Sequence, residues 1–263
     1  MPTVDVDHTA IYYEDVPGPS GAPAILWGQG FLMSTPLYAH LLALLPGYRH
    51  VIPDTRGHGR SAAGTAVPTL TRMADDLWAV ATAAGLESFF YVGHSMGGAN
   101  GVRLAARHPG VVRAGVSIAG IPVTGKLDET RADVGSLIGL AGDADALAAA
   151  LAGLFVHTAP DDPLVAECGR SGALVPREVI VPITATEFYR DDSAELLPHL
   201  TQPWLFLVPT LDGTEPEHHQ VSQAQLLPDA TVVRLEGEGH MVPQERPEAL
   251  AGPLRDFLAR HGG

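Results

Sequence analysis

Residues 89–98 read Phe-Phe-Tyr-Val-Gly-His-Ser-Met-Gly-Gly, and they carry the strongest indication of the fold in the sequence. Its first four residues are an apolar run typical of a buried strand, and residues 96–107 continue in a helical pattern. A sharp turn from strand to helix crowds its own backbone, so Gly93 and Gly97 fit where side chains would clash. The pattern predicts that Ser95 projects above a sheet, at the positive end of a helix. The alternative is a glycine-rich turn with an inert serine.

The rest of the chain alternates between short strands and longer helices, as in a mostly parallel sheet with crossover helices. We expect strands at 10–14, 24–27, 51–53, 89–92, 114–118, 205–208 and 231–235. We expect helices at 36–45, 70–84, 96–107, 216–227 and 248–260. Only helical patterns occur at 121–200, which predicts a helical cap inserted into a core of residues 1–120 and 201–263. The alternative is a set of ordinary surface helices with no site beneath them.

The composition limits the class of protein. The chain has 263 residues, 46% of them hydrophobic, which is typical of a folded globular protein. Its net charge of −14 opposes binding to nucleic acid or to an anionic membrane surface. The first ten residues lack the pattern of a secretory signal, and no apolar run reaches about 18 residues. We therefore expect a cytoplasmic protein with a small-molecule partner and no membrane span.

His240 is the strongest candidate for a base that activates Ser95. A serine hydroxyl needs such a base before it can attack a carbonyl carbon. Among the twelve histidines, His240 lies in a loop after the expected strand 231–235, which can reach the sheet edge where Ser95 stands. His94 is the neighbour of Ser95 and is too close along the chain to reach its oxygen. The other histidines considered keep a structural interpretation: His58, His218 and His219.

Asp212 is the strongest candidate for the acid that orients His240. A carboxylate fixes the tautomer of a catalytic histidine and stabilises its protonated form. Asp212 follows the expected strand 205–208 within a short loop, where Glu215 is the competing acid. The order Ser95, Asp212, His240 differs from the orders found in the serine proteases.

Backbone N–H groups are expected to stabilise the negative oxygen that forms when a carbonyl is attacked. One donor is the N–H of Met96, directly after Ser95. The second is the N–H of Phe31, in the glycine-rich loop 28–32 that follows the strand 24–27. Glycines there let the backbone approach the site closely. The alternative is a glycine-rich turn without function.

Taken together, these motifs resemble the α/β-hydrolase fold family. The resemblance covers nearly the whole chain and rests on GQGFLMS at 28–34, DTRGHGRS at 54–61, GHSMGG at 93–98, the Asp212 loop, and EGEGHMVPQERPEAL at 236–250. It implies an α/β fold with a mostly parallel sheet flanked by helices, and a helical cap inserted before the strand that bears the acid. By resemblance, Ser95, Asp212 and His240 form a catalytic triad, and the N–H groups of Phe31 and Met96 form an oxyanion hole.

Two positions depart from the family pattern. Gln29 stands where the family usually has histidine, and Pro209 stands where the acid loop usually has glycine. Neither change removes a catalytic group. Related haloalkane dehalogenases and epoxide hydrolases carry an aspartate at the position of Ser95, so the serine excludes them.

The resemblance implies a serine hydrolase acting on an ester or lactone of a small, largely apolar substrate through an acyl-enzyme. C–C bond hydrolysis and perhydrolysis use the same triad and stay open, as does a non-catalytic receptor of this fold. We expect no metal or cofactor, because no zinc-binding or nucleotide-binding motif occurs. The expected substrate contacts are Gln29, Leu32, Phe155, Phe188, Tyr189 and Met241. For the aromatic residues, ordinary packing within the cap is the alternative.

Overall fold

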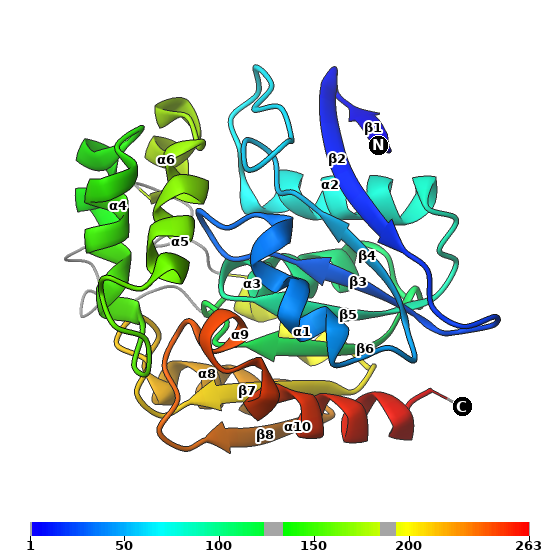
Figure 1. Cartoon of the computed structure of the whole chain (residues 1–263). Coiled ribbons are helices and arrows are strands. Elements are labelled where there is room, and N and C mark those ends of the chain that lie inside the picture. Colours follow the sequence, from blue (N-terminus) through cyan, green and yellow to red (C-terminus); the bar gives the residue numbers. More distant parts are fainter. Residues whose placement is uncertain (1, 124–133, 185–192, 263) are drawn as a thin grey trace.

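An eight-stranded sheet forms the centre of the computed structural model, which describes residues 2–123, 134–184 and 193–262 (Figure 1). The strands lie in the order β1-β2-β4-β3-β5-β6-β7-β8. The pairs β1–β2 and β2–β4 are antiparallel, and the remaining pairs are parallel. The strands are β1 (Thr3–Val6), β2 (Thr9–Val16), β3 (Ala24–Gly28), β4 (Arg49–Pro53), β5 (Phe89–His94), β6 (Val112–Ile118), β7 (Trp204–Pro209) and β8 (Ala230–Leu235).

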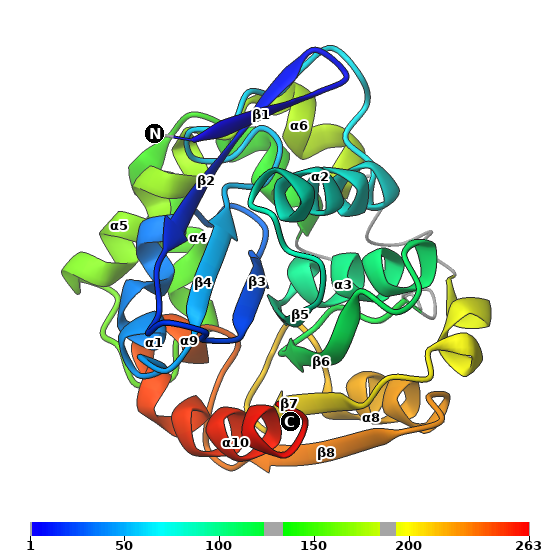
Figure 2. The same cartoon turned by 90° about the vertical axis from the view of Figure 1, so that its right-hand side faces the viewer.

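Helices cover both faces of this sheet (Figure 2). They are η1 (Thr35–Tyr38), α1 (Ala39–Ala43), α2 (Leu70–Ala83), α3 (Met96–Arg107), α8 (Glu217–Gln225), α9 (Val242–Glu245) and α10 (Pro247–Arg260). Helices α2, α3 and α8 pack on one face, and α1 and α10 on the other. Side chains alternate along a strand, so Phe89 and Tyr91 of β5 join the first core while Phe90 and Val92 join the second. Burial on both faces explains why β5 is apolar throughout.

A block of helices lies between β6 and β7, which we call the helical block (Figure 1). It contains η3 (Val134–Leu140), α4 (Ala144–Leu151), η4 (Ala152–Leu154), α5 (Pro163–Ala173), α6 (Arg177–Pro182) and η6 (Ala194–His199). Helices α4 and α5 begin at aspartate caps, since Asp143 accepts the N–H of Ala146 and Asp162 that of Leu164. Such caps satisfy backbone donors that a helix start leaves without a partner.

The predicted fold class is confirmed, and each expected strand is present within a few residues. The edge strand β1 was not predicted, because its four residues are polar at every second position and only partly buried. The single helix expected at 36–45 is divided into η1 and α1. Among the described helices, none is both long and apolar enough to cross a membrane.

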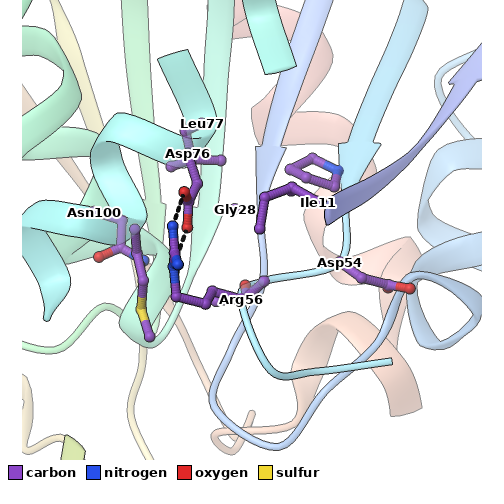
Figure 3. A pocket seen from close by; sticks show the side chains of 10 residues that line it. Ile11, Gly28, Asp54, Arg56, Asp76, Leu77 and Asn100 are labelled. Carbon is purple, nitrogen blue, oxygen red and sulfur yellow. Dashed lines mark hydrogen bonds and ion pairs between the residues drawn. The ribbon is translucent and has the colours of Figure 1, made fainter. Parts of the chain in front are cut away.

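A buried ion pair fastens the loop after β4 to helix α2 (Figure 3). The guanidinium of Arg56 donates to both carboxylate oxygens of Asp76, at 2.9 and 2.5 Å, and also to Thr9 Oγ1 at 2.9 Å. Asp54 and Asn100 line a cavity of about 10 Å³ beside the pair, enough for roughly one water molecule. Burial raises the pKa of Asp76, although Arg56 acts in the opposite direction.

We predict that Asp76→Ala lowers the free energy of unfolding by about 3–5 kcal/mol, because it leaves the charge of Arg56 buried without its partner. Asp75→Ala is the matched control. It removes the partner of Arg107 in an ion pair at the surface, with an N–O distance of 2.8 Å. That pair is solvated, so its loss costs less than about 1 kcal/mol. Urea unfolding measures both values, and equal losses would contradict the role assigned to the buried pair.

Candidate active site

Ser95 stands at the turn between β5 and α3, in a backbone conformation that only close packing maintains. Its φ of 53° and ψ of −119° lie in a backbone region that residues other than glycine rarely adopt. Its N–H donates to Ile118 O at 2.9 Å, which fixes the turn to the end of β6. A Cβ at Gly93 would collide with the backbone of Gly97, and a Cβ at Gly97 with the backbone of Gly28. These collisions are the physical reason for the glycines that the sequence motif places here.

Three residues from distant parts of the chain meet at this turn. His240 Nε2 lies 3.0 Å from Ser95 Oγ, and His240 Nδ1 lies 2.8 Å from Asp212 Oδ2. All three side chains are buried, with residue exposures of 9% or less. The carboxylate accepts a hydrogen bond, so the proton of the neutral imidazole belongs on Nδ1. Nε2 then has a lone pair directed at the Ser95 hydroxyl.

Asp212 is held as an anion by its loop. Its Oδ1 accepts the N–H groups of Thr214 at 2.8 Å and Glu215 at 2.9 Å. Burial alone would raise the pKa of Asp212, but the attraction of His240 and these hydrogen bonds outweigh it and hold the pKa below its ordinary value. Glu215, the competing acid of the sequence analysis, contributes a backbone N–H, while the carboxylate of Asp212 faces His240.

The two N–H groups expected to stabilise an oxyanion lie on segments that meet at Ser95. Met96 begins α3, so its N–H has no acceptor within the helix. On the other side, Gly30 O accepts the N–H of Met33 at 3.2 Å. The Gly30–Phe31 peptide is trans, so the N–H of Phe31 points away from that carbonyl. A Cβ built on Gly30 would lie 3.4 Å from Ser95 Cβ, which places this loop against the serine.

The side-chain amide of Gln29 is bound within the protein. It is 1% exposed, and its Nε2 donates to Thr35 Oγ1 at 2.9 Å and to Asp54 Oδ1 at 3.3 Å. Its Oε1 accepts the N–H of Thr55 at 3.3 Å. The amide therefore joins the loop after β3 to the loop after β4. These contacts support the loop, and contact between Gln29 and a substrate stays a prediction.

The remaining expected substrate contacts are apolar. Leu32, Phe155 and Met241 are buried in one hydrophobic cluster that also includes side chains of the helical block. Leu32 also packs beside Gly172 of α5. Contact between these side chains and a substrate stays a prediction. Phe188 and Tyr189 lie outside the described residues.

Glu245 joins the helical block to the loop of His240, a function that sequence analysis missed. Its carboxylate accepts the N–H groups of Val156 and His157, at 3.2 and 2.9 Å, and the hydroxyl of Thr158 at 3.2 Å. A second contact lies on α5, where Ser171 Oγ donates to Leu32 O at 2.9 Å. The block is thus attached to two of the loops that surround Ser95.

His94 is buried beside the three residues. Its Nδ1 lies 2.9 Å from Tyr38 Oη, and its Nε2 lies 2.9 Å from the carbonyl oxygen of His240. Burial, reinforced by the charge of His240, lowers the pKa of His94 to about 3. The imidazole is therefore neutral wherever the protein is folded near neutral pH.

Comparison with known proteins gives consistent matches. Residues 23–178 match a family described as alpha/beta hydrolase fold. A non-heme chloroperoxidase of Streptomyces lividans is 28% identical, over 96% of this chain and 97% of the relative. N-formylmaleamate deformylase of Pseudomonas putida is 28% identical, over 78% of this chain and 76% of the relative. The crystal structure of the enol-lactonase from Burkholderia xenovorans LB400 covers 98% of this chain and 100% of its own, with a TM-score of 0.86; its 23% identity shows the fold alone.

We predict that His94 makes stability fall with decreasing pH. The unfolded chain binds a proton on this histidine near pH 6.5, whereas the folded chain does so only near pH 3. Between these values the unfolded state binds more protons. The contribution of His94 to the free energy of unfolding is therefore complete above about pH 6.5, and it falls by roughly 1 kcal/mol per pH unit below that pH. His94→Gln removes the titrating group. Urea unfolding at pH 7, 5.5 and 4.5 should show a shallower pH dependence in this variant, and identical slopes would contradict the assignment.

Proposed function

We propose that this chain, which belongs to the alpha/beta hydrolase fold family, cleaves a carboxylic ester or lactone through an acyl-enzyme on Ser95. The observation that carries the proposal is the continuous contact from Ser95 Oγ to His240 Nε2, at 3.0 Å, and from His240 Nδ1 to Asp212 Oδ2, at 2.8 Å. A nucleophile, a base and an orienting acid in this order are the parts that acyl transfer to water requires.

In the first half of the proposed reaction, Ser95 Oγ attacks the carbonyl carbon of the substrate. Its proton moves to His240 Nε2, and the ionised Asp212 stabilises the imidazolium without taking the proton. The N–H groups of Phe31 and Met96 hold the oxyanion. When the tetrahedral intermediate collapses, the bond to the leaving oxygen breaks. His240 gives the proton to that oxygen, and the acyl group stays on Ser95 as an ester.

In the second half, water takes the place of the alcohol. His240 removes one proton from water as the oxygen attacks the acyl-enzyme. The same two N–H groups hold the second oxyanion. Collapse releases the carboxylic acid, and His240 returns its proton to Ser95 Oγ. The protein ends each cycle in its starting protonation state.

The proposed substrate is small and largely apolar. One hydrophobic cluster contains Leu32, Phe155 and Met241, and Met241 directly follows His240 in the sequence. Such apolar side chains favour an alkyl or aryl acyl group or a lactone ring over a highly charged molecule. C–C bond hydrolysis and perhydrolysis would use the same three residues, so the choice among them needs direct measurement.

We predict that Ser95→Ala lowers kcat for p-nitrophenyl butyrate by about four to six orders of magnitude, because it removes the hydroxyl that forms the acyl-enzyme in the proposed mechanism. Ser222→Ala serves as the control, since its hydroxyl bonds to the carbonyl of His219 within α8. A fluorophosphonate should label the wild type and Ser222→Ala at Ser95, as peptide mass analysis can establish. Near-wild-type hydrolysis by Ser95→Ala would reject the mechanism.

We also predict an order of substrates for the wild type. Short apolar p-nitrophenyl esters and lactones should react with higher kcat/KM than a vinylogous diketone, because an oxygen leaving group departs from the tetrahedral intermediate more readily than a carbon leaving group. Adding hydrogen peroxide to the ester assay should yield little peracid. Faster cleavage of the diketone would move the assignment to C–C bond hydrolysis, and dominant peracid formation would move it to perhydrolysis.

A further inference from the structure

Tyr38 and His94 connect the loop that follows β3 to the backbone of His240. We propose that this pair is a positioning device that sets the N–H of Phe31 against Ser95. The inference rests on the proposed function, because it concerns the donor that would hold the oxyanion. Neither residue contacts the reacting atoms in the proposed mechanism, so both are positioning residues.

Three hydrogen bonds form the device. Gly30 N–H donates to Tyr38 Oη at 2.9 Å, Tyr38 Oη lies 2.9 Å from His94 Nδ1, and His94 Nε2 lies 2.9 Å from His240 O. The carbonyl of His240 only accepts, so the proton of the neutral imidazole belongs on Nε2. Nδ1 then accepts the hydroxyl proton of Tyr38, whose oxygen accepts from Gly30. The direction of each bond follows from the one before it.

Burial makes this chain of bonds rigid. Tyr38 and His94 are each 2% exposed, so water is poorly placed to substitute for either partner. Burial also lowers the pKa of His94 to about 3 and raises the pKa of Tyr38 above its usual value. Both groups therefore stay neutral near pH 7. A buried polar group that loses its partner is costly, which holds each bond in place.

The device restrains Gly30, the residue whose carbonyl shares a peptide plane with the Phe31 N–H. Gly30 is bound on both sides, with its N–H on Tyr38 and its carbonyl on the N–H of Met33. A Cβ on Gly30 would lie 3.0 Å from His94 Nδ1, so the loop rests directly against the imidazole. The bond to Tyr38 holds the Gln29–Gly30 peptide, and the bond from Met33 holds the adjoining Gly30–Phe31 peptide, which carries the Phe31 N–H. His94 also binds the backbone carbonyl of His240. The side chain of His94 therefore positions both the loop that carries the Phe31 N–H and the backbone of the base, His240.

The hydrogen bonds of His94 show that it is placed to hold the loops and is not placed to act as a second base. The bonding partner of His94 Nε2 is the carbonyl of His240, and that of Nδ1 is Tyr38. Both ring nitrogens are thus occupied by contacts that hold the loops. Loss of the device should therefore alter the placement of donors and leave the pH dependence of kcat unchanged.

The test begins with Tyr38→Phe, which keeps the ring and removes the hydroxyl. We expect kcat to fall about tenfold to hundredfold, the size associated with a misplaced catalytic group, while KM changes by less than about twofold. Inhibition by phenylboronic acid, which forms a tetrahedral adduct on serine, should weaken by the same factor as kcat. Tyr12→Phe is the matched control, because the Tyr12 hydroxyl donates to Glu14 Oε1, at 3.3 Å, on strand β2 and away from His94.

A pair of variants at His94 tests the same bonds independently of Tyr38. The amide of His94→Gln offers an oxygen to Tyr38 and an N–H to the carbonyl of His240, so it should keep kcat within a few-fold of the wild type. His94→Leu offers neither and should lose at least as much as Tyr38→Phe. Circular dichroism and thermal unfolding establish that each variant is folded, and the pair decides the question if Tyr38→Phe fails to fold.

The outcomes separate this inference from the proposed function. If the wild type neither hydrolyses esters nor reacts with a fluorophosphonate, the serine hydrolase proposal fails. If the wild type is active, and Tyr38→Phe loses thermal stability but keeps its kcat and boronate affinity, only the positioning function is overturned. A kcat for His94→Gln as low as that of His94→Leu would also overturn it.

Discussion

The site depends on the close approach of backbones around the serine turn. Gly28 of β3, Gly93 of β5 and Gly97 of α3 leave no room for a Cβ between these elements. This contact maintains Ser95 in a conformation that an isolated turn would leave. It also brings the loop after β3 within van der Waals reach of the serine. A side chain at Gly97 would separate α3 from β3, and would thereby move both expected oxyanion donors apart.

The parallel sheet supplies the second constraint. Strands β3, β5, β7 and β8 run in the same direction, so the loops at their carboxyl ends meet on one edge. Ser95, Asp212 and His240 follow three of these strands, which explains how residues 145 and 28 positions apart form direct contacts. Burial in this region strengthens each electrostatic contact, and the N–H groups in the loop of Asp212 offset the cost of burying its charge.

The sequence was sufficient to predict those candidate site residues whose position follows from the order of the strands. Ser95, Asp212 and His240 each come just after an apolar strand, and that local signal was enough to propose that they meet. Tyr38 gave no such signal, because an aromatic residue at a helix start usually belongs to the core. The sequence also shows no sign of the hydrogen bonds of Gln29. Its partners Thr35 and Asp54 come close to it only when the loops after β3 and β4 fold together. The ion pair of Arg56 and Asp76 was likewise beyond any local pattern.

The helical block and the contacts among Ser95, His240 and Asp212 are held by different interactions. Glu245 fastens the block to the loop of His240, and Ser171 fastens it to the loop of Leu32. These contacts involve backbone groups and helix side chains, while the bonds among Ser95, His240 and Asp212 lie within the core. The apolar side chains of α4 and α5 belong to the same hydrophobic cluster as Met96 and Met241, so the block also packs on the residues beside Ser95 and His240. In the proposed function, this packing is where the helical block would influence the choice of substrate, while the hydrogen bonds among Ser95, His240 and Asp212 would carry the chemistry.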